Sequence, residues 1–276
     1  MVLGALQLPE PVVERRLSLR KGSVDKLSAA LGRMVREDPT LRVHTDPETG
    51  ELRLTGMGEL HLDVVARRLA EAHGLDVALG PPAVRGRQAL GRAVPIDFTL
   101  RKQTGGPGLY GKLVGELQPC DDVELVWEVT GGSVPSTFRK AVEEGFREAL
   151  EHDVEPPVLG ARLIVRDGDT HPNDSSDAAF RLCARFAVRE ALAQADAIPL
   201  EPIARVEVEA DAEHHGTVLS TLLQRRGRVV DTHVGPSGSR VEAEVPLAEM
   251  FGYSSVLRSA TSGSGDYTLA FSHFGR

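Results

Sequence analysis

Cysteine is scarce in this sequence, and its scarcity excludes two classes of protein. The 276 residues include only Cys120 and Cys183. Two thiols cannot form the disulfide framework of a small secreted domain or a cysteine-rich zinc site. The sequence also lacks an apolar run of the roughly 18 residues that cross a bilayer, and residues 1–6 lack the basic flank and long apolar core of a secretory signal. We therefore expect a cytoplasmic protein with no membrane partner and no bound metal.

An excess of positive charge is missing as well. Lysine and arginine number 32 against 40 aspartates and glutamates, which gives a net charge of −8. Bulk binding of nucleic acid relies on basic side chains that neutralise phosphates, so this composition argues against it. The possibility stays open that an RNA is recognised by its shape and touches only a small part of the chain. The hydrophobic share of 41% is typical of a globular protein, and the length predicts two or three domains.

Hydrophobic periodicity divides the chain into three segments, 1–94, 95–200 and 201–276. In the first segment, two helical patterns alternate with short strand patterns in the order strand, helix, strand, strand, helix, strand. Ser23 is placed to cap the first helix, and Gly80-Pro81-Pro82 is expected to close the segment. The expected elements are strands at 12–19, 41–44, 51–55 and 76–79, and helices at 23–36 and 59–73.

The third segment repeats this βαββαβ order, whereas the middle segment differs. Such an order predicts an α+β protein in which helices cover one face of antiparallel sheets. In the middle segment the expected strands are 96–102, 112–117, 123–129 and 161–165, and the expected helices are 137–151 and 175–195. In the third segment the expected strands are 203–209, 228–234, 239–246 and 267–271, and the expected helices are 213–226 and 247–259.

Residues 106–112 (GPGLYGK) match the phosphate-binding pattern G-x-x-x-x-G-K. A nucleotide site of this kind needs a Ser or Thr next, which binds Mg²⁺, and a helix that begins at the phosphates. Leu113 follows instead, and the next residues alternate as a strand. A small-molecule kinase is therefore the disfavoured alternative from another class of function, and a glycine-rich hairpin connection is favoured.

Three further clusters have both a structural and a functional interpretation. His61 has no His or Cys partner at i+4, so a packed or capping histidine is favoured over a metal ligand. Residues 174–177 (DSSD) lie where the predicted helix at 175–195 begins, which favours helix capping over a contact with RNA. They are also expected to fix the geometry of the loop before the helix. The basic run 225–228 (RRGR) suits either a helix C-terminus or a contact with rRNA phosphate, and both interpretations stay open.

Five motifs follow one another along nearly the whole chain, each in the expected kind of element. They are 37–40 with 46–50 (EDPT, DPETG), 55–63 (TGMGELHLD), 101–106 (RKQTGG), 167–171 with 174–176 (DGDTH, DSS), and 246–253 with 257–259 (PLAEMFGY, LRS). In this order they resemble domains III, IV and V of elongation factor G, a translational GTPase. The resemblance implies two ferredoxin-like βαββαβ domains that flank a ribosomal-protein-S5-domain-2-like α/β domain.

The resemblance implies ribosome binding rather than an enzyme activity in this chain. In the family, the GTPase domain lies in the N-terminal half, so GTP and Mg²⁺ are expected only for the full-length factor and no cofactor is expected here. The expected partners are rRNA, tRNA and mRNA, with domain IV at the small-subunit decoding centre and domain V near the GTPase-associated centre of the large subunit. The chain is expected to be monomeric and to act as a lever in translocation.

The resemblance also assigns site residues. Two loops form the tip of domain IV, and His171 is the residue there that suits hydrogen bonding to RNA. In domain V the candidates are basic residues and a glycine-rich turn. The tip residues are Gly105, Gly106, Pro107, Gly108, Leu109, Asp169, Thr170, His171, Pro172 and Asn173, and the domain V residues are Arg225, Arg226, Arg258, Ser262, Gly263 and Ser264.

The chain departs from the family at these same places. Elongation factor G commonly has an arginine and a glutamine in the first tip loop, where this chain has Pro107 and Leu109. Thr170 stands in place of an aromatic residue, and Ser264 and Asp266 stand in place of a basic and a small residue. Each change removes or reverses a favourable contact with phosphate. A divergent paralogue with a ribosome-recycling role, or a ribosomal protection factor of the tetracycline-resistance type, is therefore an alternative with the same fold.

Overall fold

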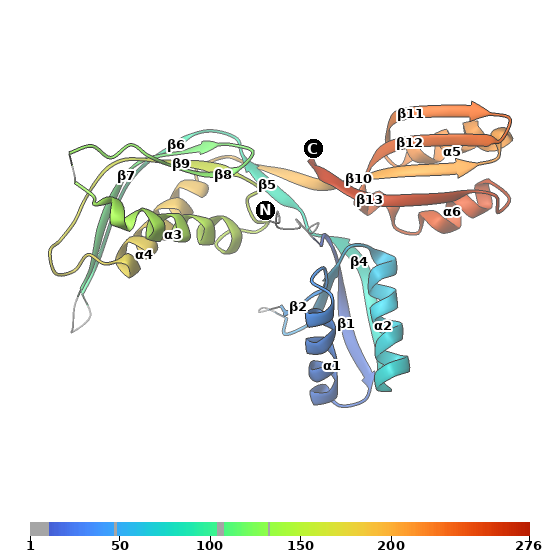
Figure 1. Cartoon of the computed structure of the whole chain (residues 1–276), viewed down its shortest axis with the longest axis horizontal. Coiled ribbons are helices and arrows are strands. Elements are labelled where there is room, and N and C mark those ends of the chain that lie inside the picture. Colours follow the sequence, from blue (N-terminus) through green and yellow to red (C-terminus); the bar gives the residue numbers. More distant parts are fainter. Residues whose placement is uncertain (1–10, 47–48, 104–107, 132) are drawn as a thin grey trace, which may run out of the picture. The chain divides into compact units, whose positions relative to one another are not determined.

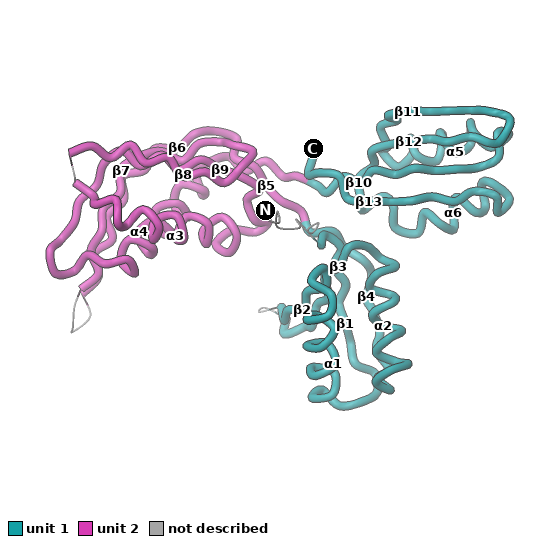
Figure 2. The backbone as a smooth tube through the Cα atoms, viewed as in Figure 1, with its two compact units in different colours: residues 1–85, 201–275 teal, residues 86–200, 276 magenta. Residues whose placement is uncertain are grey.

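The computed structural model describes residues 11–46, 49–103, 108–131 and 133–276 (Figure 1). The chain forms two compact units, residues 1–85 with 201–275 and residues 86–200 with residue 276 (Figure 2). Helices and sheets are mixed in both units, so the α+β class predicted from the sequence is confirmed. None of the helices in these described ranges is both long enough and apolar enough to span a bilayer.

The N-terminal part of the first unit has the predicted βαββαβ order. Its antiparallel sheet has the strand order β2-β3-β1-β4. The capping prediction is confirmed, because Ser23 Oγ accepts a hydrogen bond from the backbone N–H of Lys26 at 3.2 Å. Apolar side chains of both helices, such as Leu31 and Leu62, are buried in one core with Leu54 of the sheet. The elements are β1 (Val13–Lys21), α1 (Val24–Glu37), β2 (Arg42–Thr45), β3 (Leu52–Gly56), α2 (Glu59–His73) and β4 (Asp76–Val84).

Strand β4 does not end before Gly80, as the sequence suggested. It continues through Pro81 and Pro82 to Val84, and Pro82 pairs with Arg15 of β1. β4 lies at the edge of its sheet, where a proline is tolerated because its missing N–H faces no second neighbouring strand. The predicted end of the strand at residue 79 is therefore wrong, because the strand continues to Val84.

The C-terminal part of the first unit repeats the same fold, with the strand order β11-β12-β10-β13. The prediction of one continuous helix at 247–259 is wrong. Gly252 has φ 69° and separates a short 3-10 turn from α6, because this left-handed conformation cannot continue a helix. The elements are β10 (Ala197–Ala210), η2 (Ala212–His214), α5 (His215–Gln224), β11 (Arg228–Gly235), β12 (Gly238–Pro246), η3 (Leu247–Met250), α6 (Tyr253–Ala260) and β13 (Asp266–Gly275).

The second unit is built on a four-stranded sheet of order β6-β7-β9-β8, in which only β8 and β9 are parallel. Helices α3 and α4 pack closely at Gly145, where a Cβ atom would lie 2.0 Å from the carbonyl oxygen of Arg181. Phe146 and Phe180 from these helices are fully buried with Leu117 of β7. The elements are β5 (Arg87–Leu90), β6 (Val94–Lys102), β7 (Leu109–Pro119), β8 (Val123–Trp127), η1 (Ser136–Phe138), α3 (Arg139–His152), β9 (Ala161–Asp169) and α4 (Asp177–Leu192).

A short strand that the sequence did not predict completes the second unit. β5 (Arg87–Leu90) pairs antiparallel with the first four residues of β10, from Ala197 to Leu200. We call this two-stranded element the neck ribbon. It joins the segments that lead into and out of the four-stranded sheet. The strand was missed because four residues without clear alternation carry little sequence signal.

Candidate functional site

Two polar loops lie at one end of the second unit's sheet. β7 begins at Leu109 and β9 ends at Asp169, and the two strands are antiparallel, with Lys112 opposite Asp169. The loop before β7 and the loop after β9 therefore emerge at the same end (Figure 1). These are the two loops predicted to form a tip. Of the first, Gly105, Gly106 and Pro107 lie outside the described residues.

Asp174 connects the two loops through both its side chain and its backbone. Its Oδ1 accepts a hydrogen bond from the backbone N–H of Gly108 at 2.9 Å. Its carbonyl oxygen accepts another from the backbone N–H of Tyr110, also at 2.9 Å. Its Oδ2 lies 3.2 Å from Nδ1 of His171. One residue therefore holds the start of β7 and orients the histidine.

Ser175 adds a second connection between the same loops. Its hydroxyl donates to the carbonyl oxygen of Tyr110 at 2.9 Å and accepts from the backbone N–H of His171 at 2.9 Å. The next residue, Ser176, is the N-cap of α4 and accepts from the N–H of Ala179 at 3.2 Å. The capping prediction is thus confirmed for Ser176. For Asp174 and Ser175 the capping role is wrong, because both bond across the tip rather than to the helix. These bonds agree with the expectation that the residues fix the geometry of the loop before the helix.

Tyr110 and Asp169 form a further pair beside the histidine. The phenol donates to Asp169 Oδ2 at 2.7 Å. This hydrogen bond lowers the pKa of the Asp169 carboxyl and raises the pKa of the Tyr110 phenol, so at neutral pH the carboxylate accepts from a protonated phenol. The ring centroids of Tyr110 and His171 lie 6.0 Å apart. The His171 side chain is 49% exposed, so it faces solvent from a loop that several hydrogen bonds hold.

The other predicted tip residues differ in how much of each is exposed to solvent. Pro172 and Asn173 are exposed beside His171, whereas Thr170 and Leu109 are half-buried and Gly108 is buried. The buried position suits a role in loop geometry. The exposed positions suit contact with a partner.

Sequence reasoning missed two basic residues at this end of the sheet. Arg101 and Lys102 end β6 and stand opposite Tyr110 and Leu109 in β7. Both are exposed, and within the described part of the chain neither has an ion-pair partner. By contrast, Lys112 Nζ lies 3.1 Å from Asp97 Oδ1. The motif at 101–106 contained Arg101 and Lys102, but only the strand register places them beside the tip.

The nucleotide and metal alternatives find no support in the described residues. Lys112 and Leu113 lie inside β7 rather than at the start of a helix, so the geometry of a phosphate-binding loop is not met there. His61 Nδ1 accepts from the backbone N–H of Met57 at 3.1 Å, and its Nε2 lies 3.0 Å from Asp38 Oδ2. His61 is thus hydrogen-bonded within the fold on both ring nitrogens, although the N-cap of α2, Gly58, receives no side-chain cap hydrogen bond. The ranges that the structure describes contain no group of three or more potential metal ligands.

The predicted domain V residues separate into two groups. Arg226 forms two hydrogen bonds of 2.8 Å with the carboxylate of Glu201 and a third of 3.2 Å with Glu249. The guanidinium of Arg225 lies 5.2 Å from the ring centroid of Tyr253 and bonds to the carbonyl oxygen of Glu249. Both arginines are therefore engaged inside the fold. This arrangement favours the structural interpretation of the basic run.

The second group lies around the turn after α6. Ser262 and Gly263 have φ of 53° and 90°. Thr261 is fully buried, and its hydroxyl accepts from the N–H of Gly265 at 2.8 Å and donates to the carbonyl oxygen of Leu257 at 2.8 Å. Arg258, one helical turn earlier, has no ion-pair partner in the described ranges. The structure brings Arg258 together with Ser262, Gly263 and Ser264, because the N–H of Gly263 donates to the Arg258 carbonyl at 2.8 Å.

Comparison with known families covers almost the whole chain. Residues 8–81 match the family model "Elongation Factor G, domain III", residues 82–196 match "Elongation factor G, domain IV", and residues 198–276 match "Elongation factor G C-terminus". The three matches follow one another in the order expected from the motifs.

Individual relatives and a solved structure agree with these matches. The chain is 41% identical over 279 residues to elongation factor G 1 of Syntrophus aciditrophicus and 42% identical to elongation factor G 1 of Treponema pallidum. Each alignment covers 99% of this chain and 40% of the relative. A crystal structure from Thermus thermophilus superposes with a TM-score of 0.78 at 40% identity, over 98% of this chain and 41% of that one.

Proposed function

The chain belongs to the elongation factor G family, and we propose that it acts on the ribosome in the translocation of tRNA and mRNA. It spans 40% of the length of its relatives. In this proposal GTP and Mg²⁺ bind to a GTPase domain outside the 276 residues, which supplies the hydrolysis step. Residues 1–94, 95–200 and 201–276 serve as domains III, IV and V.

The observation that carries this proposal is the tip formed by the two loops. Asp174 and Ser175 hold the loops against each other, and His171 is exposed at the same end. RNA is recognised through hydrogen bonds to phosphate, ribose and base edges, which an exposed imidazole can make. The described part of the tip, which these bonds hold together, suits entry into a confined RNA site.

The proposed mechanism is steric and conformational. The tip occupies the aminoacyl-tRNA site at the decoding centre, in contact with tRNA and mRNA, and prevents their return. No bond is made or broken by residues of this chain. Hydrolysis elsewhere changes the position of the tip, as in other switches where nucleotide state moves a rigid element.

Domain V has a separate role in the proposal. Arg258 and the turn at 262–264 approach the GTPase-associated centre of the large ribosomal subunit. An arginine without an ion-pair partner in the described part of the chain can neutralise rRNA phosphate. The buried Thr261 keeps the turn in one conformation. Arg225 and Arg226, which have partners inside the fold, hold this domain together instead.

Co-sedimentation with intact ribosomes at several salt concentrations tests the proposal. We expect salt-sensitive binding, because contacts with phosphate release counterions. Replacing His171 with Ala removes hydrogen bonds to RNA and is expected to weaken binding by about threefold to tenfold. His152→Ala, an exposed histidine of the same unit, is the matched control and should leave binding unchanged. Absence of salt-sensitive binding contradicts the proposal.

A recycling or ribosomal protection role is a second candidate, because this chain departs from the family at the tip. Leu109 and Thr170 stand where the family has a glutamine and an aromatic residue. The two roles are separated by assays of tRNA movement, ribosome splitting and tetracycline release with the factor that carries this chain. Release or splitting without tRNA movement favours the second candidate.

A further inference from the structure

A row of basic side chains lies on the exposed side of α1, in the N-terminal part of the first unit. Lys26, Arg33 and Arg36 are all exposed, and among the described residues none of them has an ion-pair partner. The helical period separates them from the stripe that includes Leu27 and Leu31, which is buried in the core, as in other amphipathic helices. A basic row without partners stands out in a chain whose net charge is −8.

The carboxylates that follow the row in sequence do not neutralise it. Glu37 Oε2 accepts from Nη2 of Arg68 on α2 at 2.6 Å, and Asp38 Oδ2 lies 3.0 Å from Nε2 of His61. The helix dipole favours a basic residue in the last turn, which accounts for Arg36. It does not account for the basic residues in the middle of the helix and near its start, so their charges are available to a partner.

A shallow groove follows the same side of α1, and small residues form its floor. Gly32 is not required by the fold, because a Cβ atom there would meet only Nη1 of Arg36 within 4 Å, at 3.8 Å. Glycine lowers helix stability at such a position, so what it provides is open space. The same distance places the Arg36 guanidinium beside this space. The groove is lined by Asp25, Ser28, Ala29, Gly32, Arg33 and Arg36.

The charges along the groove favour an anion. Arg33 and Arg36 are about one helical turn apart, so their guanidinium groups can act on the same stretch of a partner. Asp25 is the single carboxylate of the lining. It lies more than two helical turns before Arg33, roughly 12 Å along the helix axis. The two positive charges therefore stand together at one end of the groove, away from the negative one.

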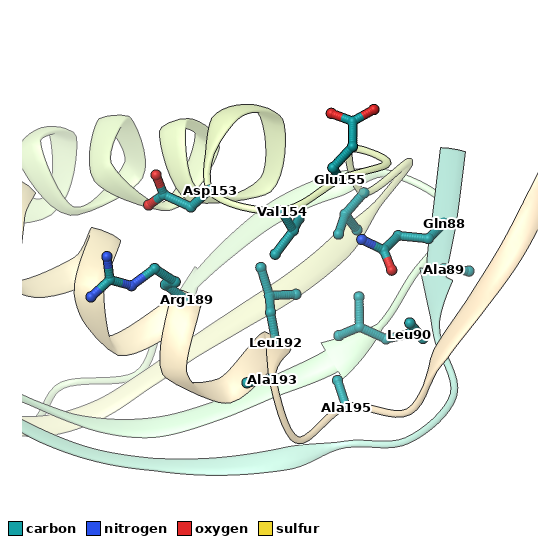
Figure 3. Close-up of a pocket in the computed structure, with 12 residues that line it drawn as sticks. Gln88, Ala89, Leu90, Asp153, Val154, Glu155, Arg189, Leu192, Ala193 and Ala195 are labelled. Carbon is teal, nitrogen blue, oxygen red and sulfur yellow. The ribbon is translucent and has the colours of Figure 1, made fainter. Parts of the chain in front are cut away.

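A hollow of about 320 Å³ beside the neck ribbon of the second unit offers no such arrangement. Figure 3 shows the Arg189 guanidinium beside Asp153, directed away from the apolar lining residues. It lies 5.0 Å from the ring centroid of Phe186, and the carboxylates of Asp153 and Glu155 belong to the lining. The α1 groove is thus the better site for an anionic partner.

The side chains of the groove suit RNA better than a protein. None of the lining residues has an apolar side chain larger than that of Ala29, so the groove has little apolar surface to bury against a protein. A guanidinium, by contrast, can bind a phosphate through two N–H groups at once. The small residues admit a sugar-phosphate strand close enough for both arginines to reach it.

We propose that the α1 face, formed by Lys26 and the residues of the groove from Ser28 to Arg36, binds the phosphate backbone of ribosomal RNA. This inference rests on the function proposed above. It adds a contact that is separate from the tip of domain IV and from the turn after α6. Contacts with phosphate position a protein on RNA without reading its base sequence, so the α1 face helps to place the factor on the ribosome.

Co-sedimentation with intact ribosomes at several salt concentrations tests the α1 face. Arg33→Gln with Arg36→Gln should make the negative slope of log affinity against log salt shallower by roughly 1.4 to 1.8, because two phosphate contacts are lost. Arg33→Lys with Arg36→Lys keeps both charges and should keep the slope. The control is Arg16→Gln with Arg42→Gln. These two arginines are exposed, and strand register places both on the sheet face opposite the helices.

Two further variants test the groove without a change of charge. Gly32→Leu fills the space beside Arg36 and should make the slope shallower to a similar extent. A photo-crosslinking amino acid in place of Ala29 should form cross-links with rRNA. If the unaltered chain does not bind ribosomes, the proposed function fails and this inference fails with it. Binding with an unchanged slope in the Arg33→Gln, Arg36→Gln variant or in Gly32→Leu, or cross-links to ribosomal proteins alone, overturns this inference only.

Discussion

The carboxylate of Asp174 accepts a hydrogen bond from the backbone N–H of Gly108, a residue 66 positions earlier in the chain. The contact is close, since a Cβ atom on Gly108 would lie 3.0 Å from Asp174 Cγ. A glycine therefore lets the backbone approach the carboxylate. This contact joins the start of β7 to the loop that follows β9, which presents His171 to solvent.

Replacing Asp174 with Ala should loosen the tip. The change leaves the N–H of Gly108 without its acceptor and is expected to lower the free energy of unfolding by about 1–3 kcal/mol. Asp174→Asn keeps an acceptor oxygen, so its loss should be smaller. Hydrogen exchange at 108–110 and thermal unfolding measure both effects. Asp121→Asn, at an exposed position of the same unit, is the control, and equal exchange in all three variants would rule out the connection.

Arg101 and Lys102 should contribute to ribosome binding although the sequence did not single them out. Each can neutralise one phosphate. Log affinity falls as log salt concentration rises, and replacing both residues with Gln should make this negative slope shallower by roughly 1.4 to 1.8. Co-sedimentation at four or more salt concentrations gives the slope. The matched double variant is Arg139→Gln with Lys140→Gln, exposed residues at the start of α3. A slope that does not change in the first variant argues against phosphate contacts at this end of the sheet.

Gly145→Ala should destabilise the second unit despite alanine's better helix propensity. The new Cβ would meet the Arg181 carbonyl oxygen, a backbone atom, at 2.0 Å, so α3 and α4 must separate. The overpacking is expected to cost about 1–3 kcal/mol of unfolding free energy, more than the gain of about 1 kcal/mol in propensity. Gly32→Ala in α1 is the comparison, because its Cβ would meet only an Arg36 side-chain atom at 3.8 Å. That variant should be stabilised, and chemical denaturation measures both.

Cys183 should react with thiol reagents only when the second unit opens. Burial raises the pKa of its thiol to about 11. Because the folded pKa exceeds the ordinary value, the unreactive thiol form dominates at pH 8, with roughly one thiolate in a thousand. Cys120 is half-buried and should react first. A colourimetric thiol assay at pH 8 should show one fast and one slow phase, and denaturant should merge them. Two fast phases in native buffer would contradict this account of Cys183.

Local patterns predicted much of the architecture. The helical spacing of Leu27 and Leu31 and the cap at Ser23 indicated α1 to within a residue or two. The break in the last helix was missed because periodicity continues across Gly252, whereas the backbone there has positive φ. The extension of β4 was missed because Pro81 and Pro82 normally end a strand. Only the position of β4 at an edge makes them acceptable.

The candidate site was predicted less completely than the fold. The resemblance brought His171 and the tip loops forward as candidates, and their RNA contacts stay predictions. Asp174 and Ser175 were predicted to cap a helix, because four polar residues before a helix are typical of a cap. Only Ser176 does so. The Glu201 partner of Arg226 could not be foreseen either, since the two residues are 25 positions apart.

The sequence by itself determined the order of the longer elements, the α+β class and the family, because these depend on residue spacing and on motifs that are read locally. The tertiary structure alone decided which side chains meet. Strand register set Arg101 and Lys102 beside the tip, and the antiparallel pairing of β7 with β9 brought Gly108 to Asp174. It also formed the neck ribbon and the hollow beside it. Contacts of this kind depend on how distant segments pack, and no local pattern records that.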